Sequence, residues 1–158
     1  QWVESGRADI GIVQLPSIKG PFVETLLFEE PFVILAAKTH ALATKRRVKL
    51  GDLADEPFVL YKGRARDAAL AACREAGFEP RIACESSELE TIRSLVAAHL
   101  GIALLPALAT RTPSANCTVI RLTDEPVKRQ VALLHRSDKT PSPSAEAFRK
   151  LLLGSGRQ

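Results

Sequence analysis

Residues 84–106, CESSELETIRSLVAAHLGIALLP, contain in order the signals of a loop, a helix, a helix stop and a buried strand. Ser87 and Glu90 have the spacing of a capping box, in which each side chain bonds the backbone N–H of the other, so a helix is expected to start here. Gly101 follows as the stop, and the unalternated apolar run 102–105 is typical of a strand covered on both faces. Apolar side chains recur on one face of this helix, at Leu89, Ile92, Leu95 and Val96.

The start of this helix is also a candidate anion site. A helix N-terminus offers free N–H donors and the positive end of a dipole, and the hydroxyls of Ser86 and Ser87 lie beside it in sequence. The alternative is that both serines only cap the helix, which is the usual role of serine at such a position.

Strand and helix signals alternate along the chain, which predicts an α/β fold with a largely parallel sheet. Breakers separate the apolar strand signals, and Glu29-Glu30-Pro31 interrupts the second of them. Two further helices are expected, one capped by Asp67 and ended by Gly77, the other started by Ser142-Pro143 and ended by Gly154. The expected strands are 9–13, 26–28 with 32–37, 57–61, 102–105, 118–122 and 130–135.

Composition indicates an ordinary soluble globular chain. Its 158 residues suit one domain or two small lobes, with 46% hydrophobic and 25% charged residues. No apolar run approaches the roughly 20 residues that a membrane span needs. The net charge of +4 is spread along the chain except for Lys45-Arg46-Arg47, which we interpret as a solvated loop in preference to a phosphate contact.

The residue types that carry catalysis and metal binding show no pattern. Three cysteines, Cys73, Cys84 and Cys117, have no paired spacing, so a disulfide framework is not expected and a reducing compartment is favoured. The chain lacks G-x-S-x-G, P-loop, G-x-G-x-x-G and H-E-x-x-H motifs, and its three histidines are scattered. We therefore expect neither an enzyme nor a metal or cofactor.

Five segments, in order and with suitable spacing, resemble the effector-binding domain of LysR-type transcriptional regulators. They cover nearly the whole chain, which makes the set more specific than any one member. They are SGRADIGI (5–12), LFEEPFVI (27–34), HALA (40–43), LGDL (50–53) and LVAAHLGIALLP (95–106).

The resemblance implies an α/β fold of the type 2 periplasmic-binding-protein class, with two Rossmann-like lobes joined by two crossover strands. Residues 1–35 and 120–158 would form regulatory lobe I, residues 36–119 would form lobe II, and the crossovers would lie near residues 33–37 and 118–122. The family's winged helix-turn-helix, and the first strand and helix of lobe I, have no counterpart in this sequence.

The same resemblance implies an effector site in the cleft between the lobes. Its residues would follow strand ends or open helices, where an amide, hydroxyls, N–H donors and cations suit a small carboxylate. Lys62 and Arg64 could equally be solvent-exposed charges of a loop. The predicted effector-binding residues are Gln14, Lys62, Arg64, Ser86, Ser87 and Pro106.

Two positions, His99 and Ala41, depart from the family pattern. Ala41 stands where the family commonly has proline, and no function is attached to it. His99 stands where the family usually has glycine, and histidine tolerates a positive φ better than most residues; a ligand-contacting or pH-sensing His99 is the alternative. Residues 87–109 resemble the peroxide-sensing branch, and Cys73 falls where that branch has its second redox cysteine. The reactive cysteine would fall at Arg64, so ligand sensing is expected in place of a disulfide switch.

The function implied is that of a cytoplasmic sensor domain. A small, anionic metabolite would bind in the cleft and alter the arrangement of a homodimer or homotetramer whose DNA-binding domains lie outside this chain. RNA polymerase is the further partner that the family implies for the parent protein, and no membrane is expected. The alternatives are a secreted solute-binding protein of the same fold and an oligomerisation module with a vestigial cleft.

Overall fold

The chain forms two compact units. The computed structural model describes residues 1–112, 114–124 and 127–155. Unit 1 contains residues 1–29 and 130–158, and unit 2 contains residues 30–129.

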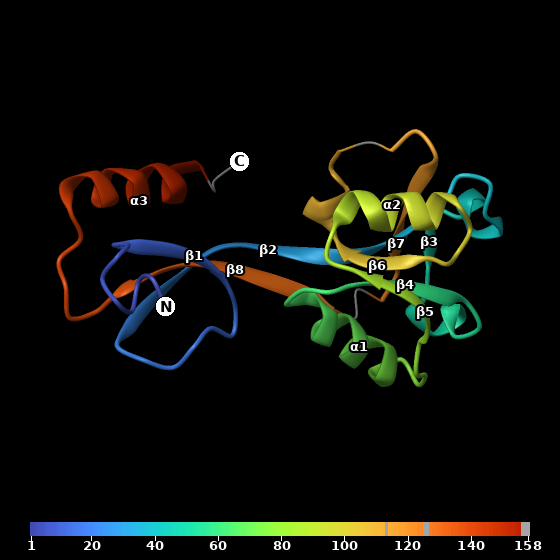
Figure 1. The fold of residues 1–158 in the computed structure, drawn as a ribbon, viewed down its shortest axis with the longest axis horizontal. Helices are drawn as coiled ribbons and strands as arrows, with labels where there is room; N and C mark the ends of the chain where they lie inside the picture. The colour runs from blue at the N-terminus through green and yellow to red at the C-terminus, as the bar shows by residue number, and fades with distance from the viewer. Residues whose placement is uncertain (113, 125–126, 156–158) are drawn as a thin grey trace. The chain divides into compact units, whose positions relative to one another are not determined.

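Two long strands connect the units (Figure 1). Strand β2 (Phe22–Ala37) leaves unit 1 after Glu29, and strand β8 (Lys128–Arg136) returns to it at Gln130. The predicted crossovers near 33–37 and 118–122, and the predicted lobe boundaries, fall inside unit 2. That the two units are the regulatory lobes of the family stays a prediction.

Unit 1 is a small sheet with a C-terminal helix. Strand β1 (Ile10–Gln14) pairs antiparallel with β8, which lies between β1 and β2. Helix α3 (Pro143–Ser155) begins as predicted, because the Ser142 hydroxyl accepts a hydrogen bond from the Ala145 N–H at 3.3 Å. Gly154 does not end this helix, which continues through Ser155.

Unit 2 is a larger sheet with helices packed on both faces. Strand β7 (Cys117–Leu122) lies between β2 and β3 (Arg47–Val48), and β6 (Ala103–Pro106) pairs with the other side of β2. Strands β4 (Pro57–Tyr61) and β5 (Arg81–Ser86) are parallel, and a parallel bridge between Phe58 and Ile102 joins β4 to the residue before β6. Short 3-10 helices complete the unit: η1 (Ala41–Thr44), η2 (Leu50–Leu53) and η3 (Ala107–Thr110).

Helices α1 and α2 close the two hydrophobic clusters of unit 2. Helix α1 (Ala65–Glu75) contributes Ala69 and Cys73 to the cluster on one side of the sheet. Helix α2 (Leu89–Ala97) buries Ile92 and Val96 completely in the cluster on the other side, while Leu89 and Leu95 are partly buried at its margin. The predicted apolar face of the helix in residues 84–106 is confirmed.

The prediction of a largely parallel sheet is wrong for the connecting strands. Strand β2 is continuous through Glu29-Glu30-Pro31 and pairs antiparallel with both β6 and β7, and β8 pairs antiparallel with β1. The apolar runs suggested buried strands but carried no information about direction, which depends on how the distant segments meet.

The start of α1 also differs from the prediction. The helix begins at Ala65, so Asp67 lies in its first turn and does not cap it. Arg64 occupies the N-cap position, and its side chain makes no capping hydrogen bond. Gly77, at φ +93°, follows the end of α1 as expected, because this backbone conformation favours glycine.

The turn that ends helix α2 lies at His99 and not, as expected, at Gly101. His99 has φ +61°, which confirms its predicted positive φ, and its N–H bonds the carbonyl of Val96 at 3.0 Å. The Leu100 N–H bonds the carbonyl of Leu95 at 3.1 Å, so the pair forms a Schellman motif. Gly101 is needed for a different reason, because a Cβ there would lie 2.4 Å from the carbonyl oxygen of Pro57.

We expect Gly101→Ala to destabilise unit 2 by about 1–3 kcal/mol, because the added methyl overpacks the approach of residue 102 to β4. Gly154→Ala is the matched control, since nothing lies within 4 Å of a Cβ at that helical position. The control should leave stability unchanged or raise it by up to about 1 kcal/mol. Urea unfolding measures both variants, and equal midpoints would contradict the close-approach role of Gly101.

Candidate functional site

Four of the predicted effector-binding residues follow the carboxyl ends of β4 and β5. The two strands are parallel and in register at Tyr61 and Ser86, and the Lys62 N–H donates to the Ser86 carbonyl at 2.7 Å. Helix α1 begins after Lys62 and Arg64, and α2 begins after Ser86 and Ser87. The parallel pairing therefore brings both helix N-termini to one edge of unit 2.

Pro106 ends β6 at the same edge. Strand β6 continues the parallel bridge that joins Phe58 to Ile102, so its carboxyl end points in the same direction as that of β4. Pro106 is buried and pairs with Phe32 of β2. The sixth predicted residue, Gln14, ends β1 in unit 1, and its participation in a site with the others stays a prediction.

The predicted capping box does not form. Helix α2 begins at Leu89 with Glu88 at the N-cap, and no side chain caps it. Ser86 accepts a hydrogen bond from the Glu88 N–H at 3.1 Å, which makes a local serine turn, and Ser87 is exposed. The Glu90 carboxylate bonds Arg93 and does not reach back to Ser87.

Arg93 explains why the box is lost. Its side chain is only 11% exposed, and its guanidinium also donates to the Ala109 carbonyl at 2.8 Å, so it is held near Glu90 by a segment remote in sequence. A charge-assisted bond to a fixed guanidinium is stronger than the bond to a backbone N–H that a capping box offers. The first N–H groups of α2 are consequently left without a side-chain cap, which preserves an anion-binding helix end.

The cations at this edge differ in their pairing. Glu85, half-buried on β5, forms ion pairs with Lys62 at 3.8 Å and with Arg66 at 2.9 Å. Arg64 is exposed and has no ion pair among the described residues. Of the two predicted cations, Arg64 is therefore the one whose charge is available to a ligand.

The ion pair between Glu85 and Arg66 was not predicted from the sequence. Arg66 donates to one oxygen of Glu85 from both Nε and Nη2, at 3.1 and 2.9 Å. Their contact joins the end of β5 to the first turn of α1. Nothing in the local spacing of either residue predicts it, because the pairing of β4 with β5 creates the contact.

The segment that follows Pro106 contacts a buried carboxylate, that of Glu30. Glu30 is 5% exposed, accepts the Leu108 N–H at 2.6 Å and forms an ion pair with Arg129. Leu108 belongs to η3, which follows Pro106 directly. The end of β6 is thus fixed by a charge that cannot be solvated where it lies.

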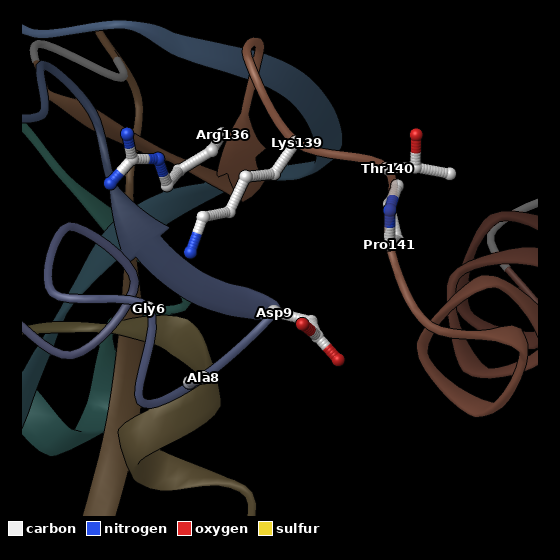
Figure 2. Close-up of a pocket in the computed structure, with 7 residues that line it drawn as sticks. All are labelled: Gly6, Ala8, Asp9, Arg136, Lys139, Thr140 and Pro141. Carbon is white, nitrogen blue, oxygen red and sulfur yellow. The ribbon is translucent and has the colours of Figure 1, made fainter.

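A depression in unit 1 beside Asp9 and Lys139 is too small for a metabolite. Figure 2 shows Lys139 and Arg136 on one side of it and Asp9 on the other, with the Asp9 carboxylate directed away from the Lys139 ammonium. Asp9 accepts a hydrogen bond from Ser142 at 2.6 Å, and Arg136 is paired with Asp138. A cavity volume of about 20 Å³ has room for one or two water molecules.

The cysteines are not placed for redox chemistry. Burial, with a smaller effect of the Glu79 charge, raises the pKa of the Cys73 thiol to about 11, and a protonated thiol is a poor nucleophile. Cys117 is also buried, Cys84 is half-buried, and all three are free thiols. In the described residues no group of three or more His, Cys, Asp and Glu side chains could hold a metal ion.

A mixed α/β chain that gathers helix N-termini, hydroxyls and a free cation at the carboxyl ends of its strands has the architecture of a small-ligand-binding domain. Residues 1–157 match the LysR substrate binding domain. The chain belongs to this family, and its fold is the predicted type 2 periplasmic-binding-protein-like class.

Curated relatives are transcriptional regulators. The chain is 32% identical over 149 residues to the uncharacterized HTH-type transcriptional regulator YwbI of Bacillus subtilis. The match covers 92% of this chain and 50% of that protein. It is 34% identical over 139 residues to the DNA-binding transcriptional dual regulator OxyR of Escherichia coli, covering 85% and 45%. The chain therefore spans about half the length of these relatives.

One solved structure of similar fold is described as a complex with an effector. The BenM effector binding domain with its effector benzoate has a TM-score of 0.82 and 25% identity, over 99% of this chain and 75% of that one. None of these matches supports the alternative of a secreted solute-binding protein. Among the described residues no helix is long and apolar enough to cross a membrane.

We expect Glu30→Ala to lower the free energy of unfolding by about 3 kcal/mol, because it removes one partner of a buried ion pair and leaves the Leu108 N–H without an acceptor. Glu30→Gln keeps a hydrogen-bond acceptor, so its free energy of unfolding should fall by less. Glu75→Ala, which removes an exposed carboxylate from α1, is the control and should change stability little. Urea unfolding at neutral pH would contradict the structural role of Glu30 if the two alanine variants behaved alike.

We expect Cys84 to be the first thiol that Ellman's reagent modifies in the folded chain at pH 8. Cys73 remains protonated there because its pKa is about 11, and Cys73 and Cys117 are buried. The variant Cys84→Ser should therefore lose the fast phase, while all three thiols react in urea. Fast labelling of Cys73 at pH 8 would show that its thiol is accessible and ionised.

Proposed function

We propose that this chain is the effector-sensing part of a LysR-type transcriptional regulator and that its effector is a small, anionic metabolite. The observation that carries the proposal is the edge of unit 2, where the strand pairing places the uncapped N-terminus of α2, the exposed Ser87 and Arg64, which has no ion pair with any described residue. Backbone N–H donors, a hydroxyl and a guanidinium are the groups that bind a carboxylate.

The ion pair between Lys62 and Glu85, next to Arg64, favours an effector with a single negative charge. Lys62 is already paired with Glu85, so the edge offers one guanidinium and the N-termini of α1 and α2 in place of several free cations. The benzoate of the BenM structure is an anion of this kind. Gln14 of unit 1 is proposed as a further ligand through its amide.

We further propose that effector binding acts on the arrangement of subunits in a homodimer or homotetramer. The parent protein would hold DNA through a domain outside this chain and act in the cytoplasm, with RNA polymerase as a partner. An effector can shift such an assembly only by binding one of its arrangements more tightly than the other. The chain itself would have no enzymatic activity, in keeping with relatives that are transcriptional regulators.

We expect benzoate, or another small monocarboxylate of a panel, to raise the melting temperature of the chain, because a ligand of the folded state stabilises it by mass action. For the best carboxylate, Arg64→Gln should weaken binding about tenfold or more and Ser87→Ala about fivefold, by the usual worth of a charged and a neutral hydrogen bond. Isothermal titration calorimetry measures both.

Lys150→Gln is the control for the loss of one positive charge, since Lys150 is exposed on α3 in unit 1. Its affinity for the same carboxylate should equal that of the unchanged chain. Unaltered binding by Arg64→Gln and Ser87→Ala would show that the effector site is elsewhere, and no response to any anion of the panel would contradict an anionic effector.

A further inference from the structure

A group of five exposed cations lies at the β3 side of the unit 2 sheet. Strand β3 pairs in parallel with β7 so that Arg47 stands opposite Arg121, and the Arg121 N–H donates to the Arg46 carbonyl at 3.3 Å. Figure 1 shows the two strands beside each other. The group, here called the basic surface, consists of Lys45, Arg46, Arg47, Lys49 and Arg121.

The basic surface has no countercharge. Among the described residues none of its five side chains forms an ion pair, although six other arginines of the chain do. These paired arginines are Arg66, Arg74, Arg93, Arg129, Arg136 and Arg149. Unpaired cations that lie together produce a local positive potential much stronger than the net charge of +4 suggests.

Protection of a sheet edge does not account for the whole group. Charged side chains on an edge strand discourage pairing with another molecule, and this would suffice for β3. Arg121, however, lies on β7, which is flanked by β2 and β3. Two like charges directly opposite each other on neighbouring strands repel, and an anion that contacts both arginines would relieve this repulsion.

The two arginines are presented on an open part of the sheet. Side chains alternate along β7, so Arg121 shares a face with Cys117 and Val119. Cys117 is buried in the cluster under α2, but Val119 is 44% exposed, so α2 does not cover this face as far as Arg121. Arg47, in register with Arg121, is exposed as well.

We propose that the basic surface binds the phosphate backbone of duplex DNA. This replaces the interpretation of Lys45-Arg46-Arg47 as a solvated loop, because the sequence did not show that Arg121 lies beside them. Guanidinium groups fit phosphate oxygens in a two-pronged geometry, and duplex DNA offers closely spaced phosphates to several cations at once. The choice of DNA rests on the proposed function, in which the parent protein is held on DNA by another domain. A weak, sequence-independent contact is then strengthened by the high local concentration of phosphates.

The test is the binding of a fluorescein-labelled duplex of arbitrary sequence to the 158-residue chain, followed by anisotropy at increasing NaCl concentrations. We expect weak binding, with a Kd on the order of 10⁻⁴ to 10⁻⁶ M that rises steeply with salt. The double variant Arg47→Gln/Arg121→Gln should reduce the slope of log K against log salt by about 2, because each arginine would neutralise one phosphate.

The double variant Lys19→Gln/Lys150→Gln is the matched control, because it removes the same charge from exposed positions of unit 1. Its salt slope should equal that of the unchanged chain. Circular dichroism establishes that both variants are folded.

Absence of duplex binding at low salt, or equal losses in the two double variants, would overturn the proposal. Binding of polyglutamate without binding of DNA would also overturn it and assign the surface to an acidic protein. The result is separable from that for the effector, because Arg47→Gln/Arg121→Gln should keep the melting-temperature response to the carboxylate panel.

Discussion

The carboxylate of Glu30 is buried in unit 2 at the point where β2 has just left unit 1, and a charge in such a place must be satisfied by the protein. Its partners are Arg129, on the returning strand β8, and the backbone N–H of Leu108 in η3. One side chain therefore ties together the two strands that connect the units and the turn after β6. The position of Pro106 follows from this contact, because η3 begins at the next residue.

The candidate site depends on three strands of unit 2 ending at one edge. Gly101 permits residue 102 to approach β4 closely enough for the Ile102 N–H to bond the Pro57 carbonyl at 2.8 Å. The pairing of β4 with β5 then sets the starts of α1 and α2 next to each other. Apart from the Arg64 guanidinium, the donors of the site are thus backbone groups and short side chains held by a rigid sheet, which is the arrangement that limits the entropy lost on binding a small ligand.

Electrostatic pairing separates the cations of unit 2 into three groups. Arg93 and Arg129 are structural, because each is largely buried and fixes a segment remote in sequence. Lys62 is neutralised by Glu85, and Arg64 has no ion pair with any residue that the structure describes. Within the part of the chain that the structure describes, the side chains of the basic surface form no ion pair with a carboxylate. This separation follows from the tertiary contacts, since the sequence shows basic residues spread along the chain with Lys45-Arg46-Arg47 as a local cluster.

Features that depend on neighbours in the chain were predictable from the sequence. The start of α3 at Ser142-Pro143, the apolar face of α2, the positive φ of His99 and the family are such features. The direction of the strands, the pairing of Glu30 with Arg129 and the loss of the capping box at Ser87 depended on the tertiary structure. In the first two cases a residue far along the chain supplies the partner. At the capping box the competing partner of Glu90 is Arg93, three residues away, which the Ala109 carbonyl holds in place. A spacing rule describes what one turn of backbone can reach, and it holds only while no distant group makes a stronger bond.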